Sequence, residues 1–396
     1  TSAIAASNTF SGAGTLALTA STGAQSVTAT TATISAAMGD GDDTLSLGAA
    51  ANVTAADAIN MGGGTGDVIA ISADGDATGA VFDEAGHVGA ETISVAAHST
   101  TASTNAKVNL NYSAAYDQNI IVDASGMTDS SADFVLAVGT AGNVDGDLTV
   151  RASAGANTLA GGDGNDIFEF SAITAFTAAD TVAAGGGTGD QIRLTADNSA
   201  TGGVLDDGHS GVESVVIMPS STTTDNAKLT LNYATSNTTA ITINAAALTD
   251  TSAQFTLALG GTTGNVDNVL TVIGGAGNDT IDGGDAADII TAGNGADSIS
   301  GGGGNDIIVV DADDSASVAG IAGDATGQDH FDDYASGDII RITGELADGF
   351  SAATDVLVGT GTEASDVAVA DVDDFLTSTY LVARDGVITD GFDTAI

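Results

Sequence analysis

The chain has 396 residues, and its 53 acidic side chains stand against only six lysines and arginines, which gives a formal net charge of −47. So strong a negative field repels nucleic acid and anionic membranes and argues against both as partners. No apolar run reaches the roughly 18 residues that a membrane-spanning helix needs. The absence of cysteine excludes disulfides and thiol chemistry.

The remaining composition favours a folded chain with a thin core. Hydrophobic residues make up 43% of the sequence and the mean hydropathy is +0.22, which argues against disorder. Aromatic residues are only 4% and tryptophan is absent, so Ala, Val, Ile, Leu and Thr must fill narrow stacked layers. Because so many carboxylates repel one another, we expect compactness to depend on bound cations.

Residues 1–37 are rich in Ala, Ser and Thr, with apolar alternation over residues 15–19. They predict one or two strands, which could be the end of an upstream module. The sequence starts at Thr1 and shows no signal-peptide pattern. Either its N-terminus was trimmed or it is part of a longer protein, so the missing signal decides little.

A long internal repeat begins at Met38. The glycine- and aspartate-rich residues 38–43 recur at 161–166, the run GGGTGD at 62–67 recurs at 185–190, and KVNLNY at 107–112 recurs as KLTLNY at 228–233. These matches predict two tandem modules, residues 38–160 and residues 161–273.

Within each module the apolar residues alternate with a period of two, which indicates strands. The expected inward residues are Val108, Leu110, Tyr112, Ile120, Val122, Phe134, Leu136, Val138, Leu148 and Val150, answered by Leu229, Leu231, Tyr233, Ile241, Ile243, Phe255, Leu257, Leu259, Leu270 and Val272. Short strands separated by Gly, Asn, Asp and Ser fit a solenoid or a sandwich. We favour the solenoid, because a continuous stack shields strand edges.

Each module opens on an isolated loop of acidic and glycine residues. Residues 161–169 (GGDGNDIFE) place Asp166 where a metal ligand would stand, and residues 38–46 place Asp43 there. The runs Gly62–Asp67 and Gly185–Asp190 lack the lysine of a phosphate-binding P-loop. They are either β-turns or further calcium loops.

Residues 274–309 form four nine-residue units, GGAGNDTID, GGDAADIIT, AGNGADSIS and GGGGNDIIV. The sixth place of every unit is an aspartate and the eighth an isoleucine: Asp279, Asp288, Asp297 and Asp306, and Ile281, Ile290, Ile299 and Ile308. Glycine at the first, second and fourth places permits positive φ angles. The loop offers only oxygen ligands, which suit Ca²⁺. We predict calcium binding by these aspartates, with loops shaped by Gly275, Gly277, Gly284, Gly302 and Gly304.

This pattern resembles the calcium-binding repeat of RTX proteins. The resemblance implies a parallel β-roll in which two units make one turn, the isoleucines point inward, and each ion lies between loops on the same side. Asp279 should then face Asp297, and Asp288 should face Asp306. The second and third units depart from the pattern at Ala286 and Ala292. The expected fold is all-β: a parallel β-solenoid with calcium-binding nonapeptide repeats at residues 274–310 and a C-terminal β cap.

Residues 311–396 form this expected cap. Residues 329–342 resemble the segment that closes many RTX arrays, and residues 381–384 and 387–389 predict two strands around a turn. In RTX proteins such a cap adjoins or contains the signal for type I secretion. A plain capping domain without an export role is the alternative.

No constellation of catalytic residues emerges, and we predict that the chain is not an enzyme. The four histidines include no H-E-x-x-H zinc motif, and His87 and His209 recur at matching places in the two modules. They are therefore expected to be structural strand-end or loop residues. Pairs of carboxylates arise by chance among so many acids and carry no weight.

The two modules also resemble the surface-layer proteins of Gram-negative bacteria, which are acidic, poor in lysine and end in RTX arrays. The resemblance implies a secreted, extracellular, calcium-dependent structural protein. Its partners would be further copies of itself, in a lattice or filament, and a cell-surface polysaccharide as anchor. The alternatives are an RTX adhesin or biofilm-matrix protein that binds a glycan or surface, and the non-catalytic part of a larger RTX protein.

Overall fold

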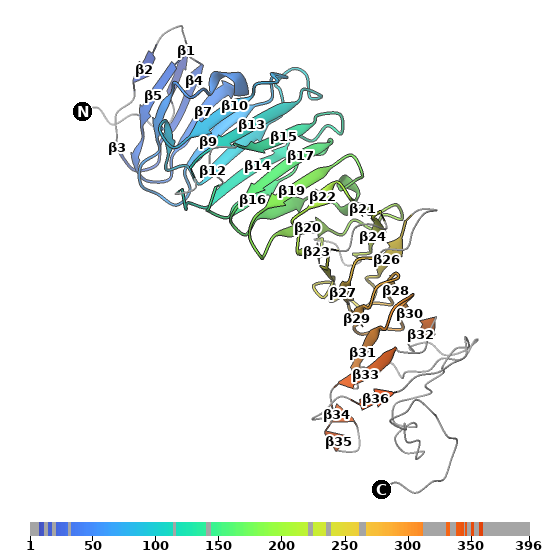
Figure 1. The fold of residues 1–396 in the computed structure, drawn as a ribbon. Coiled ribbons are helices and arrows are strands. Elements are labelled where there is room, and N and C mark those ends of the chain that lie inside the picture. The colour runs from blue at the N-terminus through green and yellow to red at the C-terminus, as the bar shows by residue number, and fades with distance from the viewer. Residues whose placement is uncertain are drawn as a thin grey trace, which may run out of the picture. The chain divides into compact units, whose positions relative to one another are not determined.

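A computed structural model describes residues 8–11, 15–17, 21–30, 33–113, 116–139, 144–220, 225–234, 239–260, 267–311, 330–332, 338–343, 345–346, 350–351 and 356–358. Strands dominate this part of the chain, with two short 3₁₀ helices, η1 (Ala50–Asn52) and η2 (Ile173–Ala175). Within it no helix is long and apolar enough to cross a membrane. The chain divides into two compact units (Figure 1).

Unit 1 comprises residues 1–171, 177–193 and 208–212. Its long sheet contains, in spatial order, β1 (Asn8–Ser11), β4 (Ser26–Thr30), β7 (Thr44–Ala49), β9 (Val68–Ser72), β12 (Thr92–Ala96), β14 (Ile120–Gly126), β16 (Leu148–Arg151), β18 (Ile167–Phe170) and β20 (Gln191–Thr195, of which residues 191–193 belong here). The described strand pairs of this sheet are all parallel.

The other sheets of unit 1 complete its turns. One contains β10 (Ala80–Asp83), β13 (Ala106–Asn111), β15 (Phe134–Val138), β17 (Asn157–Gly162), β19 (Thr181–Gly185) and β22 (His209–Ser210). Another contains β11 (His87–Val88), β8 (Ala58–Asn60), β5 (Thr33–Ala37) and β2 (Thr15–Ala17), and β3 (Ser21–Thr22) pairs with β6 (Gly39–Asp40). Each turn of the chain thus contributes one strand to the long sheet and one or more to the others.

Unit 2 comprises residues 172–176, 194–207 and 213–396. One of its sheets runs β23 (Ser214–Met218), β25 (Ile241–Asn244), β27 (Leu270–Ile273), β29 (Ile289–Thr291), β31 (Ile307–Asp311), β33 (Ile339–Thr343) and β36 (Val356–Val358). The other runs β21 (Gly203–Asp206), β24 (Ala227–Asn232), β26 (Phe255–Leu259), β28 (Thr280–Asp282), β30 (Ser298–Ser300) and β32 (His330–Asp332). Among the described strand pairs of unit 2, only β33–β36 and the separate pair β34 (Glu345–Leu346)–β35 (Phe350–Ser351) are antiparallel.

Both units are therefore parallel β-solenoids, and the predicted fold class is confirmed. The alternating side chains explain the architecture, because every second residue of a strand points into the narrow interior. The predicted inward residues are buried, with two exceptions. Val138 and Leu259 are half-buried, because β15 and β26 end at these residues.

Residues 8–37 contain five strands, β1 to β5, so the prediction of one or two strands was wrong. Two of these strands, β2 and β3, are only three and two residues long, and β3 is too short to show a two-residue period in the sequence. The segment boundaries predicted from the internal repeat remain predictions. The strands expected at residues 381–384 and 387–389 lie outside the described residues.

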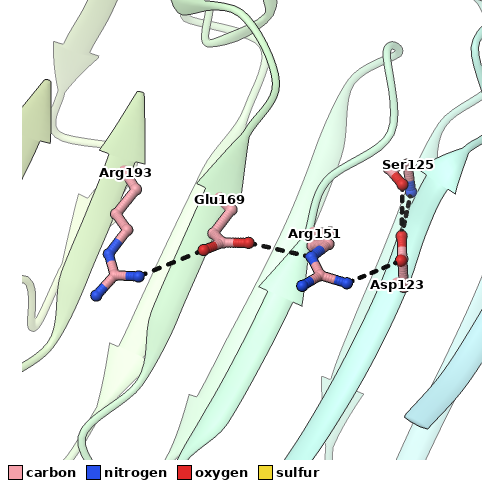
Figure 2. Close-up of polar contacts among 5 residues, drawn as sticks. All are labelled: Asp123, Ser125, Arg151, Glu169 and Arg193. Atoms are coloured by element: carbon pink, nitrogen blue, oxygen red, sulfur yellow. Dashed lines mark hydrogen bonds and ion pairs between the residues drawn. The ribbon is translucent and has the colours of Figure 1, made fainter. Parts of the chain in front are cut away.

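An ion ladder crosses the outer face of the long sheet in unit 1. Figure 2 shows Arg151 between Asp123 and Glu169, at N–O distances of 3.1 Å each, and Glu169 also 3.4 Å from Arg193. Burial alone would raise the pKa of Asp123, but hydrogen bonds from Ser125 and Arg151 outweigh it and lower that pKa. All four ladder side chains are partly exposed, so each pair contributes at most about 1 kcal/mol.

Candidate metal centre

The four nonapeptides in unit 2 supply four strands, and each strand follows a glycine-rich loop. The first and third units supply β28 and β30, which pair in parallel, and the second and fourth supply β29 and β31. The eighth-place isoleucines are at most 4% exposed. Two units therefore make one turn, and loops two units apart stack on the same side.

The stacking brings the sixth-place aspartates together in pairs. The backbone N–H of Asp279 donates to Oδ1 of Asp297 at 2.8 Å, over a separation of 18 residues. The N–H of Asp288 donates to Oδ1 of Asp306 at 2.9 Å, and the N–H of Asp306 donates to Oδ1 of Asp338 at 3.0 Å. The structure thus places the facing pairs where the RTX resemblance put them.

These carboxylates are buried, each only 1% exposed in Asp279, Asp288, Asp297 and Asp306. Burial raises the pKa of Asp279 to about 6, although the N–H groups of Phe255 and Gly275 hydrogen-bond to it. Burial, with the nearby Asp306 carboxylate, raises the pKa of Asp288 to about 8. Oδ2 of Asp288 is buried and has no hydrogen-bond partner among the described residues. A buried acceptor left unpaired costs about 1–3 kcal/mol, and more when charged, so the site favours a cation.

The glycines of the array allow the loops to stack at van der Waals distance. Gly284, Gly302 and Gly304 have φ of 111°, 86° and 113°. A Cβ on Gly302 would lie 1.9 Å from the carbonyl oxygen of Gly284, and a Cβ on Gly277 would lie 1.7 Å from that of Ala253. Side chains at these places would therefore displace the loop carbonyls.

First-place glycines have a different role from the one expected. Gly274, Gly283 and Gly301 are not in the left-handed region, so the prediction of positive φ at this place was wrong. A Cβ at these positions would instead lie 2.5–2.7 Å from Oδ2 of the aspartate five residues later. The first-place glycine leaves room for the carboxylate that folds back over it and, at Gly274 and Gly283, for a carbonyl oxygen that would lie 1.8 and 2.6 Å from a Cβ.

In two loops the carboxylate is capped within its own loop. The N–H of Gly275 donates to Oδ2 of Asp279 at 2.6 Å, and the N–H of Gly162 donates to Oδ2 of Asp166 at 2.6 Å. Neither glycine is in the left-handed region. Oδ1 of Asp166 accepts from the N–H of Leu148 at 2.7 Å, so both of its oxygens have donors. Burial raises the pKa of Asp166 to about 7 despite these bonds.

The structure also places Asp43 in a column of stacked loops, in unit 1. The N–H of Gln25 donates to Oδ1 of Asp43 at 2.6 Å, the N–H of Asp43 donates to Oδ1 of Asp67 at 2.7 Å, and the N–H of Asp67 donates to Glu91 at 2.7 Å. Burial raises the pKa of both Asp43 and Asp67. As in the array, the backbone N–H of one aspartate donates to the carboxylate of the aspartate one turn later. Here, however, Asp43 and Asp67 are 24 residues apart.

Sequence reasoning did not single out the buried Asp338, and it left the role of the buried Asp67 and Asp190 open. Asp67 and Asp190 end the two GGGTGD runs, whose role was left open. Asp57 and Asp180 end two identical Thr-Ala-Ala-Asp segments, and these carboxylates serve the fold. Oδ1 of Asp57 accepts from the N–H of Ile34 at 2.7 Å and Oδ2 from that of Thr54 at 2.8 Å. The recurrence of Thr-Ala-Ala-Asp in the sequence was the signal from which Asp57 and Asp180 could have been found.

The two repeated histidines lie at strand ends, one of the two locations expected from the sequence. His87 and His209 each begin a two-residue strand and are buried. The N–H of Asp83 donates to Nδ1 of His87 at 3.3 Å, and the His87 ring packs edge-on against Phe82. Burial lowers the pKa of His87.

The donor set fits calcium. Among the described residues, no group of three or more histidine or acidic side chains is arranged so that it could hold a metal ion by itself. An ion here would be held by one or two carboxylates, with the loop carbonyls that the glycines bring close completing the shell. Six to eight oxygens of this kind are what Ca²⁺ takes, whereas a softer metal would need nitrogen or sulfur.

A family model described as the RTX calcium-binding nonapeptide repeat, with four copies, matches residues 145–172 and 273–308. No curated protein and no solved structure matches the chain. The chain therefore carries RTX calcium-binding repeats on an all-β parallel solenoid, and Ca²⁺ is the ion that such repeats bind. The assignment of individual ligands remains a prediction, including Asp43, which lies outside the matched residues.

Proposed function

We propose that this chain is a calcium-dependent structural protein that self-associates into a bacterial surface layer or an extracellular filament. RTX repeats are typical of secreted proteins, and a β-solenoid that carries them fits a structural or adhesin-type protein. Such a solenoid is typically non-catalytic, and the proposal includes a chain without enzymatic activity. Type I secretion and a polysaccharide anchor rest on the sequence resemblance alone.

The buried aspartates of the array carry the calcium-dependent part of the proposal. They are stacked 18 residues apart in both loop columns, on a chain with a net charge of −47. Without a cation, ionised carboxylates in these columns repel one another and lack solvation. Calcium binds the ordered loops and not the unfolded chain, so its binding free energy stabilises the fold.

One outer face of the array supports self-association. Ile289, Ile307 and Ile339 lie side by side across β29, β31 and β33, and Ile273 and Val309 flank Thr291 in the next row. Ile289 is 38% exposed, and the other four apolar side chains are half-buried. We call these five residues the apolar strip.

The charge around the apolar strip favours a second copy of this chain as its partner. The outward side chains of β25, β27 and β29, with Ile307 and Val309, are uncharged. The row continues from Val309 to Arg341 of β33, and β31 ends at Asp311. The opposite sheet presents Thr280 and Asp282 on β28 and two serines on β30. On so acidic a chain, a face whose central side chains are uncharged is where two copies can approach with least repulsion.

Sedimentation velocity and electron microscopy of the purified chain, with calcium and with chelator, test the proposal. Ordered sheets or fibres should form only with calcium. Ile289→Asp should abolish them, whereas Thr280→Asp, at the same place of its repeat on the opposite sheet, should assemble like the wild type. A chain that folds with calcium but stays monomeric would contradict self-association and favour an adhesin.

A further inference from the structure

The loops that precede β7 and β9 in unit 1 stack closely, although they lie outside the residues matched as RTX repeats. The N–H of Gly63 donates to the carbonyl of Gly39 at 2.8 Å, and the N–H of Gly41 donates to that of Gly63 at 2.7 Å. A Cβ on Gly62 would lie 1.8 Å from the Gly39 oxygen. The two loops therefore stack directly on one another, with their backbones joined by hydrogen bonds.

Two fully buried carboxylates lie at the inner ends of these loops. Asp43 and Asp67 are 0% exposed. Their Oδ1 atoms accept from the N–H groups of Gln25 and Asp43. Both Oδ2 atoms are buried, and neither has a hydrogen-bond partner among the described residues. A buried carboxylate oxygen without a donor is stable only beside a cation or a proton.

The loop conformation explains why these oxygens lack a donor. In the capped loops of Asp166 and Asp279, the N–H of Gly162 or Gly275 turns inward onto Oδ2. Gly39 and Gly62 instead have φ of 107° and 96°. The N–H of Gly62 points away and donates to Oδ1 of Asn60 at 2.9 Å. Asp288 shares this open state, since Gly284 has φ of 111° and Oδ2 of Asp288 has no partner among the described residues.

We propose that Asp43 and Asp67 hold a hard divalent cation, calcium, between the loops of residues 39–43 and 62–67. The donors are carboxylate and carbonyl oxygens, which exclude metals that require nitrogen or sulfur. The site differs from the array in turn length, 24 residues against 18, and in the extra residue of the second loop. It extends the proposed calcium dependence to unit 1.

Calcium stoichiometry of the full-length chain, measured by isothermal titration calorimetry and equilibrium dialysis, tests this site. Asp43→Asn and Asp67→Asn remove a charge and preserve side-chain shape, so each should lose the same single ion. The control Asp74→Asn removes one charge from the same module, from a side chain whose oxygens accept the N–H groups of Ala51 and Asp76. It should bind as many ions as the wild type. Undiminished stoichiometry in folded Asp43→Asn and Asp67→Asn would overturn the proposal.

Hydrogen exchange of the wild-type chain decides the question if these variants fail to fold. Calcium should slow amide exchange at least tenfold in residues 39–43 and 62–67. Residues 54–57, whose Asp57 carboxylate has both oxygens satisfied, should change little. Equal exchange of the two loops with and without calcium would overturn the site. Calcium protection confined to residues 274–309 would leave the array's calcium dependence intact while refuting this proposal.

Discussion

The array in unit 2 and the first module in unit 1 reach the same arrangement by different routes. In the array each turn contains two nonapeptides, so aspartate loops lie on both sides of the roll. In the module the turn from Asp43 to Asp67 is longer, at 24 residues, and contains a Thr-Ala-Ala-Asp corner at residues 54–57. The difference teaches that a buried aspartate column depends on a glycine loop ahead of a strand, and not on a nine-residue period.

Removal of calcium should destabilise the array more than the first module, and this is the largest expected effect. Each saturated site contributes about 2.7 kcal/mol at a hundredfold excess of ion over its dissociation constant, so losing several ions can unfold the array. The module should retain protection at its corners, where Asp57 needs no cation. Circular dichroism and hydrogen exchange after chelation measure this. Uniform loss of protection in both regions would contradict the distinction.

Alanine substitution of the stacked glycines tests the common feature of the two regions. A Cβ would lie 1.9 Å from a carbonyl oxygen at Gly302 in the array and 1.8 Å at Gly62 in the module, and both have positive φ. Gly302→Ala and Gly62→Ala should each cost about 2–4 kcal/mol. The control Gly63→Ala meets only Asp40 Oδ1 at 3.4 Å and should cost less than about 1 kcal/mol. Thermal unfolding in calcium measures the stability of all three variants. A similar loss of stability in Gly63→Ala and in the other two would show that close stacking of the loops does not determine stability.

Open and capped aspartates should respond differently within the array itself. Asp288→Asn removes the carboxylate whose Oδ2 has no partner among the described residues, so calcium affinity should fall at least about tenfold, or 1.4 kcal/mol. In Asp279→Asn the amide can leave the Gly275 N–H without an acceptor, which costs about 1 kcal/mol of stability, with a smaller loss of affinity. Calcium titrations of the two variants measure the difference. The reverse order of affinities would contradict the assignment of open and capped states.

The contrast between the regions also explains what could be predicted from sequence. The array was recognisable because Asp279 to Asp306 and Ile281 to Ile308 recur in phase, and the resemblance to RTX repeats, in which two units make one turn, implied the facing pairs. Asp67 could not be assigned, because the extra residue in its loop breaks the nine-residue register. The open or capped state of a loop depends on the φ of one glycine, such as Gly284 or Gly275, and neighbouring turns determine it. Composition and spacing contain no such information.

A pH titration of the calcium-free chain should reveal the buried carboxylates. Burial raises the pKa of Asp288 from 3.8 to about 8, of Asp166 to about 7 and of Asp279 to about 6. The folded state thus binds protons that the unfolded state has released, and stability should decrease as the pH rises from about 4 to about 8. With calcium the direction reverses, because protons compete with the ion and acidification weakens binding. Denaturant unfolding at several pH values measures both, and a calcium-free chain most stable at pH 8 would contradict it.

The smallest expected effect concerns the ion ladder of unit 1. Arg193→Gln removes the 3.4 Å contact with Glu169 but leaves the Arg151 pairs with Asp123 and Glu169 intact. Because these side chains are partly exposed, the loss should be below about 1 kcal/mol and should shrink in molar salt. Calcium binding by the array should not change, since the ladder lies on the outer face of a different unit. A large, salt-independent loss would mean that unit 1 depends on its few cationic side chains as strongly as the array depends on calcium.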